Sequence, residues 1–221
     1  NSPERAKVAL KWASYAAEMS RARATLDECA ARDFQRHGKL MDVTTRGIKP
    51  PDPRGHIGYW LQKGFAVVAP IRPGYGDTGG VDREYSGVRY DMFGNCWGPP
   101  DFGRAAAAAT TAITATLEWL RHQHWADTDR IVLAGSSMGG LTSIASAAAN
   151  PPGVVAYINF AGGTGGDSGR APKHSCGSEE MATLMRSYGR TTHVPGLWLY
   201  AENDLYWGAE WPRVWYRAFS S

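Results

Sequence analysis

The sequence predicts an α/β fold, a three-layer sandwich in which helices cover both faces of a mostly parallel sheet that is incomplete at its edges. Apolar, often β-branched runs alternate with longer helical stretches along the chain, and this alternation is typical of parallel sheets. One apolar run leads through a Gly-x-Ser-x-Gly motif into an Ala-rich segment. A length of 221 residues with 43% hydrophobic residues suits one α/β domain with a sizeable core.

Residues 1–50 are expected to be an N-terminal helical extension without an assigned role. Ser2 and Pro3 suit the start of a helix, and the residues up to 36 are rich in Ala, Arg, Glu and Leu. Gly and Pro then interrupt the chain repeatedly up to residue 56. The α/β domain is expected to occupy residues 51–221.

Within that domain, regular elements are expected to alternate in order. Residues 57–63 predict a short helix that ends at Gly64, and residues 65–71 predict a buried strand. Residues 72–102 follow as a loop, rich first in Gly and then in aromatic residues. The further expected strands are 131–134, 154–160 and 195–201, and the further expected helices are 103–124, 141–149, 179–188 and 209–219.

Ser137 is the candidate nucleophile. It stands in the motif Gly135-x-Ser137-x-Gly139, between an expected strand and an expected helix, and in that context the motif forms a sharp turn that exposes the serine hydroxyl. The turn would lie at the carboxyl edge of the sheet, where open α/β folds bind ligands. The N–H group of Met138, at the start of the helix, would stabilise an oxyanion formed there. The alternative is a structural glycine-rich turn.

Asp204 is the candidate acid of a catalytic triad. In this order of elements the acid follows a strand downstream of the serine, and Asp204 lies just after the strand expected over residues 195–201. Glu202 is the second choice and Asp167, after the preceding strand, is the third. The alternative for Asp204 is a solvated carboxylate in a loop.

The base that should accept the serine proton is not evident. A serine nucleophile needs such a base, usually a histidine that follows the acid in chain order, and residues 205–221 contain no histidine. His174, in the loop after residues 154–160, is a weak candidate. The expected explanation is that the sequence stops before the last strand and the histidine loop. The His37-Gly38 pair is interpreted as accidental, so the second oxyanion donor stays unassigned.

Aromatic and cysteine side chains add two further hypotheses. Tyr75, Trp97 and Trp207 are expected to shape an apolar acyl pocket near the serine. Cys96 and Cys176 lie in Gly/Pro-rich loops, and a disulfide between them would imply an oxidising compartment. The alternative is two free thiols.

Several classes of function are disfavoured. The net charge of +3 is too small for a nucleic-acid-binding surface, and no apolar run approaches the length of a transmembrane helix. The glycine-rich loop lacks the spacing of nucleotide-binding motifs. No C-x-x-C or other metal-ligand spacing is present, so no metal and no cofactor are expected. The compartment, cytoplasmic or exported, and the oligomeric state are left open.

Together these segments resemble the α/β-hydrolase superfamily, and within it the dienelactone-hydrolase-like and prolyl-oligopeptidase-like serine esterases. The similar segments are 64–70, 72–76, 131–140, 150–154, 158–163 and 195–204. The resemblance implies that Ser137 is the nucleophile, Met138 the backbone oxyanion donor and Asp204 the acid. Dienelactone hydrolases use a cysteine nucleophile, so the serine favours a general esterase.

The chain departs from that superfamily at both ends. Its members carry a Gly-His pair beyond the last helix and open with several strands, whereas residues 1–50 here predict a charged helix. The expected function is a serine hydrolase that cleaves a small carboxylic ester or related acyl substrate through an acyl-enzyme on Ser137. The alternatives are a catalytically incomplete or inactive α/β-hydrolase-fold protein and a serine peptidase of prolyl-oligopeptidase type.

Overall fold

The computed structural model describes residues 56–221, apart from residues 76, 77 and 79. The chain divides into two compact units, each considered by itself. The first comprises Asn1–Asp82 and Gln123–Ala126, and the second comprises Arg83–His122 and Asp127–Ser221. The helical extension predicted over residues 1–50 lies outside the described residues.

Helix α2, His56–Gln62, belongs to the first unit and confirms the short helix predicted there. Gly64 ends it with a φ of 85°, a conformation open to glycine. The N–H groups of Gly64 and Phe65 donate to the carbonyls of Leu61 and Trp60, at 3.0 and 3.1 Å. This arrangement is a Schellman motif, and it folds the Phe65 ring against the Trp60 ring at 5.2 Å.

The strand predicted over residues 65–71 is wrong, because the structure has no strand there. The backbone N–H of Phe65 is engaged in ending α2, and Phe65 and Val68 are each 37% exposed. An apolar run becomes a strand only when a neighbouring strand pairs with it. Among the described residues, no strand does so.

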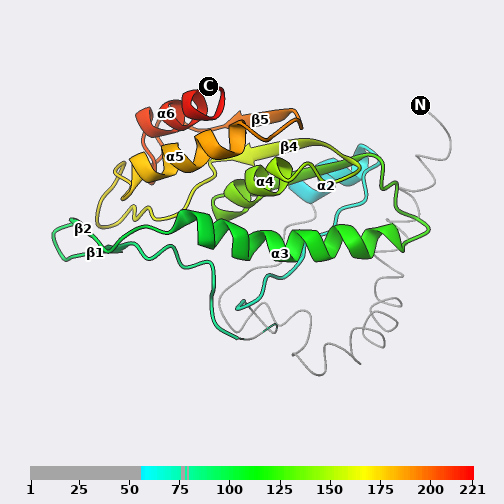
Figure 1. The fold of residues 1–221 in the computed structure, drawn as a ribbon, viewed down its shortest axis with the longest axis horizontal. Coiled ribbons are helices and arrows are strands. Elements are labelled where there is room, and N and C mark those ends of the chain that lie inside the picture. Colours follow the sequence, from blue (N-terminus) through cyan, green and yellow to red (C-terminus); the bar gives the residue numbers. More distant parts are fainter. Residues whose placement is uncertain (1–55, 76–77, 79) are drawn as a thin grey trace. The chain divides into compact units, whose positions relative to one another are not determined.

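A parallel sheet forms the centre of the second unit (Figure 1). Its strands are β3, Ile131–Ser136, β4, Val154–Phe160, and β5, Gly196–Leu199, in the order β3-β4-β5. They confirm three predicted strands, with small shifts at the ends. The last residues of all three strands are in register, since Ser136 pairs with Phe160 and Phe160 with Leu199. The carboxyl edge of the sheet is therefore level.

Four helices belong to the same unit as this sheet, and all four were predicted. They are α3, Phe102–Arg121, α4, Met138–Ala148, α5, Ser178–Gly189, and α6, Glu210–Phe219. The helix α4 packs on β3 and β4, and α3 packs against α4. The helix α5 packs against α6, and the buried Trp215 ring of α6 donates its N–H to the carbonyl of Ser178 at 2.9 Å.

The unit has the predicted mixed α/β fold with a parallel sheet, and the three-layer sandwich is incomplete in it. Both crossovers, from β3 to β4 and from β4 to β5, step in the same direction, so their right-handed connections place α4 and α5 on one face. Side chains of that face, such as Leu133 and Tyr157, are buried. Side chains of the other face, such as Leu197 and Leu199, are exposed. A second covered face would require the strand order to reverse.

A short hairpin interrupts the segment predicted as loop. Its strands are β1, Arg89–Tyr90, and β2, Cys96–Trp97, which pair antiparallel. The turn between them is closed by the Asp91 carboxylate, which accepts the N–H groups of Phe93 and Asn95 at 2.8 and 2.9 Å. A disulfide joins Cys96 to Cys176, just before α5, with Cα atoms 5.6 Å apart.

The double variant Cys96→Ser/Cys176→Ser should have a free energy of unfolding about 2–5 kcal/mol lower than the parent protein. The bond spans 80 positions in the sequence, so its removal returns a large loop-closure entropy to the unfolded chain. Guanidinium-induced unfolding measures the change. Cys29→Ser, which removes a cysteine outside this bond, is the matched control, and equal midpoints for all three proteins would contradict the expectation.

Candidate active site

Ser137 has a backbone conformation that side-chain-bearing residues rarely adopt. Its φ is 55° and its ψ is −123°, a strained combination that must be held by its surroundings. The Ser137 N–H donates to the carbonyl of Phe160 at 3.0 Å, and its carbonyl accepts the N–H groups of Gly140, Leu141 and Gly163 at 2.9–3.1 Å. The side chain is exposed at the carboxyl end of β3.

Small residues make this turn possible, though not only those of the predicted motif. A Cβ atom at Gly135 would overlap the backbone of Gly139, and one at Gly140 would overlap the Asn159 side chain. A Cβ at Gly139 would meet nothing within 4 Å. Gly135 and Gly140 therefore allow the close approach. The sequence prediction missed Gly140, for which the doubled glycine was the available signal.

The N–H of Met138 opens helix α4 and points away from the intrahelical ladder. Among the described residues, no group accepts this N–H. The partial positive charge at the start of a helix adds to the donor strength of such a group. An oxyanion formed beside Ser137 could accept a hydrogen bond from it.

The loop after β4 is held by a buried polar network. The fully buried Asn159 accepts the N–H of Gly162 at 2.7 Å and donates to the Tyr200 hydroxyl at 3.0 Å. Tyr200 in turn donates its hydroxyl proton to the carbonyl of Gly162 at 2.6 Å. Burial raises the pKa of Tyr200 well above its usual value, so the phenol stays protonated and keeps this bond. The network joins β4, the loop and the end of β5.

Asp204 lies in the turn after β5. Its carboxylate accepts the N–H groups of Tyr206 and Trp207 at 2.7 and 3.0 Å, and its side chain is half-buried. The Trp207 indole donates to the carbonyl of Ala161 at 2.9 Å. The turn with Asp204 is thus tied to the same loop that contacts the Ser137 carbonyl.

Ser137 and Asp204 therefore lie at one edge of the sheet, after β3 and β5. The last residues of these strands are both in register with Phe160, so their backbones are two strand spacings, or about 10 Å, apart. The other acid candidates have different partners. Glu202 is exposed and forms an ion pair with Arg213 at 2.7 Å. Asp167 accepts backbone N–H groups, chiefly that of Arg170, which lower its pKa.

Among the described residues, no histidine forms an ion pair with Asp204. The exposed His174 lies in the loop after β4, where its backbone N–H donates to the carbonyl of Ala171. The backbone N–H of His193, close before the amino end of β5, donates to the Asn150 side-chain oxygen at 2.7 Å. His122 lies 3.4 Å from Glu118 at the end of α3. Among the described residues, no histidine is therefore assigned as the general base for Ser137.

The three aromatic residues predicted to line an acyl pocket lie in different environments. Trp207 is only 3% exposed and its ring contacts that of Trp215 at 5.6 Å, so it supports the site from within. Trp97 is 53% exposed, and the Arg89 guanidinium lies over its ring, 5.0 Å from the ring centroid. Tyr75 belongs to the first unit.

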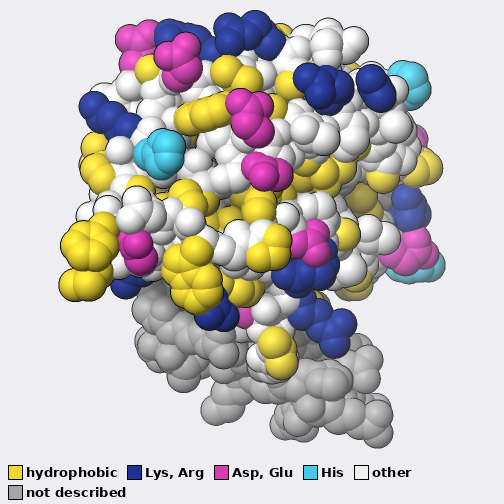
Figure 2. Space-filling model, turned by 60° about the vertical axis from the view of Figure 1, so that its left-hand side comes forward, with side chains coloured by type: hydrophobic (Ala, Val, Ile, Leu, Met, Phe, Trp, Pro, Cys, Tyr) yellow, Lys and Arg dark blue, Asp and Glu magenta, His cyan; other side chains and the backbone are white. Residues whose placement is uncertain are grey.

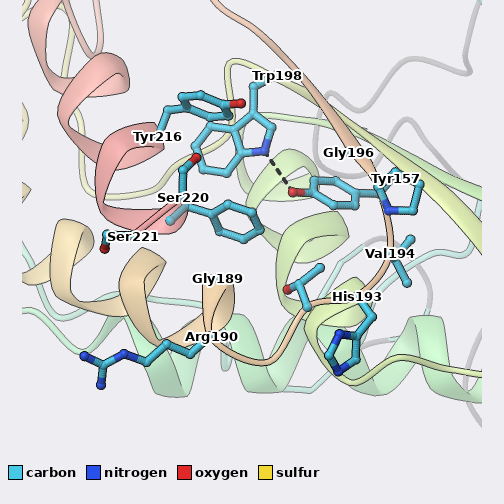
Figure 3. A pocket seen from close by; sticks show the side chains of 13 residues that line it. Tyr157, Gly189, Arg190, His193, Val194, Gly196, Trp198, Tyr216, Ser220 and Ser221 are labelled. Atoms are coloured by element: carbon cyan, nitrogen blue, oxygen red, sulfur yellow. Dashed lines mark hydrogen bonds between the residues drawn. The ribbon is translucent and has the colours of Figure 1, made fainter.

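A cavity of about 470 Å³ lies at the opposite edge of the sheet (Figure 3). Its aromatic lining includes Tyr157, Trp198 and Tyr216, and the Trp198 indole donates to the Tyr157 hydroxyl at 3.0 Å. The cavity adjoins Pro195 and Gly196, where β5 begins. It is therefore separate from the edge that carries Ser137.

Two further features were sought in residues 56–221. No helix described there has both the length and the apolar character that crossing a bilayer requires. The same residues contain no group of three or more His, Cys, Asp or Glu side chains arranged to bind a metal ion.

Comparison with known families gives one match. The model of the family described as X-Pro dipeptidyl-peptidase (S15 family) matches residues 9–169. This range contains β3, Ser137, α4 and β4, and it ends before Asp204. The comparisons with curated proteins and with solved structures gave no match.

Gly140→Ala should lower the free energy of unfolding by about 1–3 kcal/mol, the usual cost of overpacking. The added Cβ would overlap Asn159 and lie 2.7 Å from the Cα of Gly162. Gly139→Ala is the matched control, because the same atom there meets nothing within 4 Å. Chemical denaturation of both variants measures the difference, and equal stabilities would contradict the account of the turn.

Proposed function

The chain belongs to the X-Pro dipeptidyl-peptidase (S15) family, and on that premise we propose that it is a serine hydrolase with Ser137 as its nucleophile. The family is one of α/β-hydrolase-type serine peptidases and esterases, and it supports serine hydrolase chemistry in general. The assignment of Ser137 is supported by its position inside the matched range and by its exposed side chain at the carboxyl end of β3.

The observation that carries the proposal is the strained backbone of Ser137. Strain of this kind costs about 1–3 kcal/mol and clusters at functional sites. Here four backbone hydrogen bonds hold it, one through the Ser137 N–H and three through its carbonyl. A glycine at this position would fold with less strain. The presence of an exposed serine instead favours a chemical role over a purely structural one.

The proposed reaction uses these groups in the following order. The Ser137 Oγ attacks the acyl carbonyl of the substrate while a general base takes the hydroxyl proton. The carbonyl oxygen becomes an oxyanion that accepts the Met138 N–H, an interaction worth about 3–4 kcal/mol in comparable sites. Collapse of the tetrahedral intermediate releases an alcohol or amine, and water then hydrolyses the acyl-enzyme. Asp204 would orient the base.

Two substrate classes share this acyl-enzyme chemistry. The family match favours a peptide cleaved after an X-Pro pair, whereas the motif sequence around Ser137 resembles that of general carboxylic esterases. We propose peptides as the class to be assayed first and small esters, including those of dienelactone-hydrolase-like enzymes, as the second. Release of a free amine or of an alcohol distinguishes them.

A catalytically incomplete protein is the second candidate. It is favoured by one observation, the lack of any described histidine in an ion pair with Asp204. Such a protein would keep the fold and the exposed serine without an activated nucleophile. Reactivity of Ser137 decides between the two candidates.

A biotinylated fluorophosphonate should label the protein, and Ser137→Ala should reduce labelling below detection, because this reagent requires an activated serine. Ser136→Ala, at the neighbouring exposed serine of β3, is the matched control and should keep labelling within about twofold. Mass spectrometry of the labelled protein reads the result. Labelling that survives Ser137→Ala would exclude Ser137 as the nucleophile, and a folded protein that is never labelled would be the incomplete form.

Asp204→Asn should lower the rate of labelling by at least about a hundredfold, because an amide cannot stabilise the protonated base. Glu202→Gln, two positions earlier and in an exposed ion pair with Arg213, should change the rate by less than about threefold. The rate constants are measured with the same fluorophosphonate at several concentrations. The reverse ranking of the two variants would assign the acid to Glu202.

A further inference from the structure

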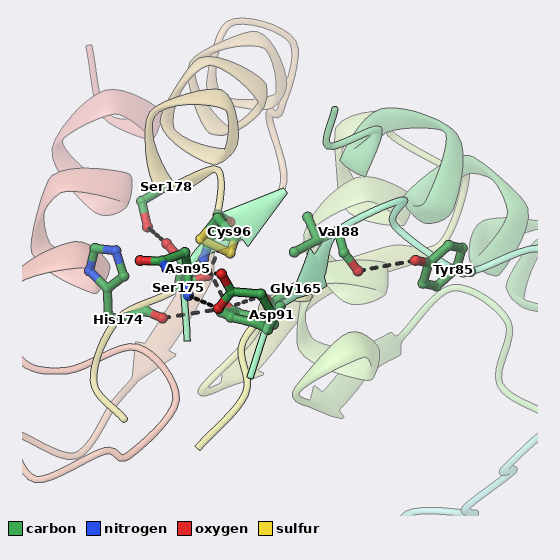
Figure 4. Close-up of a disulfide and its surroundings, with 11 residues drawn as sticks. Tyr85, Val88, Asp91, Asn95, Cys96, Gly165, His174, Ser175 and Ser178 are labelled. Atoms are coloured by element: carbon green, nitrogen blue, oxygen red, sulfur yellow. Dashed lines mark hydrogen bonds between the residues drawn. A yellow bond between two sulfur atoms is a disulfide. The ribbon is translucent and has the colours of Figure 1, made fainter. Parts of the chain in front are cut away.

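The hairpin of residues 89–97, formed by β1, β2 and their turn, is fastened to the loop after β4 (Figure 4). The Tyr90 hydroxyl donates to the carbonyl of Gly165 at 2.6 Å and accepts the N–H of Cys176 at 3.1 Å. The disulfide between Cys96 and Cys176 adds a covalent link at the other strand. Both strands of the hairpin are thus attached to one loop.

The turn of the hairpin is also held in one conformation. Asp91 accepts hydrogen bonds from Phe93 and from the backbone and side chain of Asn95, and the bonds from Asn95 lower the pKa of its carboxyl group. Gly94 has a φ of 82°, and a Cβ there would overlap the carbonyl of Arg170. The turn therefore rests directly on the same loop.

That loop also contacts the segments that carry the candidate nucleophile and the candidate acid. The N–H of Gly163 donates to the carbonyl of Ser137 at 3.1 Å, two residues before the Gly165 carbonyl that Tyr90 binds. The N–H of Lys173 donates to the carbonyl of Leu205, next to Asp204, at 2.7 Å. In Figure 1 the hairpin lies at the end of the unit toward which β4 and β5 point. The hairpin is thus a neighbour of the catalytic edge.

The hairpin, which these hydrogen bonds and the disulfide hold in place, exposes apolar side chains to solvent. Met92 and Phe93 are 86% and 79% exposed at the turn. Trp97 and Tyr85 flank Arg89, whose guanidinium lies over the Trp97 ring and donates to the Tyr85 hydroxyl at 3.0 Å. Figure 2, which views this end of the molecule, shows hydrophobic side chains spread among charged ones.

Exposed apolar side chains mark a ligand-binding surface where they gather around a site. Leu205 and Tyr206, which follow Asp204 in the sequence, are also exposed. Two segments that contact the loop after β4 therefore expose apolar side chains. A substrate with an apolar acyl chain would cover these side chains, since removing apolar surface from water is favourable.

We propose that the hairpin of residues 89–97 is a specificity-determining wall of the acyl-binding site, with Trp97 as its main contact. The inference rests on the proposed serine hydrolase function. The disulfide is the positioning element, because each strand has only two residues and a two-stranded ladder of this size is marginal by itself. Without the bond, the strand that contains Trp97 would lose its covalent link to the loop after β4.

Acylation by two esters tests the proposal. p-Nitrophenyl acetate and p-nitrophenyl octanoate both transfer an acyl group to Ser137 Oγ and release p-nitrophenol, whose appearance gives the single-turnover rate. Trp97→Ala should slow acylation by the octanoate about tenfold and leave that by the acetate within about twofold. Trp97→Phe, which keeps an aromatic ring, should restore most of the octanoate rate.

The double variant Cys96→Ser/Cys176→Ser should shift the octanoate-to-acetate ratio in the same direction as Trp97→Ala. Cys29→Ser, outside the disulfide, is the matched control and should leave the ratio unchanged. Circular dichroism establishes that each variant is folded, and Ser137→Ala gives the background rate of ester cleavage.

The outcomes separate this inference from the proposed function. An unchanged ratio in Trp97→Ala, or equal slowing with both esters, would overturn the hairpin's role while leaving Ser137 as nucleophile. An unchanged ratio in the disulfide variant would overturn the positioning role of the bond. Equal rates for the parent protein and Ser137→Ala would overturn both the proposed function and the inference that rests on it.

Discussion

The carbonyl oxygen of Ser137 is the point on which the candidate site depends. It accepts three backbone N–H groups, two from the start of α4 and one from Gly163 in the loop after β4. These bonds compensate for a backbone conformation that costs about 1–3 kcal/mol by itself. They also explain why Gly140 must be small, since a larger residue would push the helix start away from Asn159 and Gly162. The exposed hydroxyl follows from this arrangement.

The loop after β4 connects this turn to the rest of the catalytic edge. Asn159 and Tyr200 fix its first residues by hydrogen bonds to Gly162, and Trp207 fixes the next by a bond to Ala161. The Asp204 turn and the hairpin of residues 89–97 contact later parts of the same loop. One segment therefore sets the positions of nucleophile, candidate acid and hairpin, so changes in it should affect all three together.

Local patterns predicted the elements that depend on local sequence, and they failed where distant partners decide. The strands at residues 131–136 and 154–160, with the helices around them, were evident from apolar runs and helix formers. The run at residues 65–71 has the same appearance, yet it lacks a partner strand among the described residues and its first N–H serves to end α2. The placement of α4 and α5 on one face of the sheet depends on strand order, which no single segment encodes. The hairpin has strands of two residues, too short for any periodicity. The disulfide could be named as a hypothesis from two loop cysteines, but their proximity is a property of the fold.

The role of Ser137 as nucleophile is tested most directly by the crystal structure of the protein after reaction with a fluorophosphonate. We expect a phosphorus atom bonded to the Ser137 Oγ, with the phosphonyl oxygen within about 3 Å of the Met138 N–H and the Ser137 φ still positive. An adduct on another residue, or a phosphonyl oxygen that faces away from the start of α4, would contradict it.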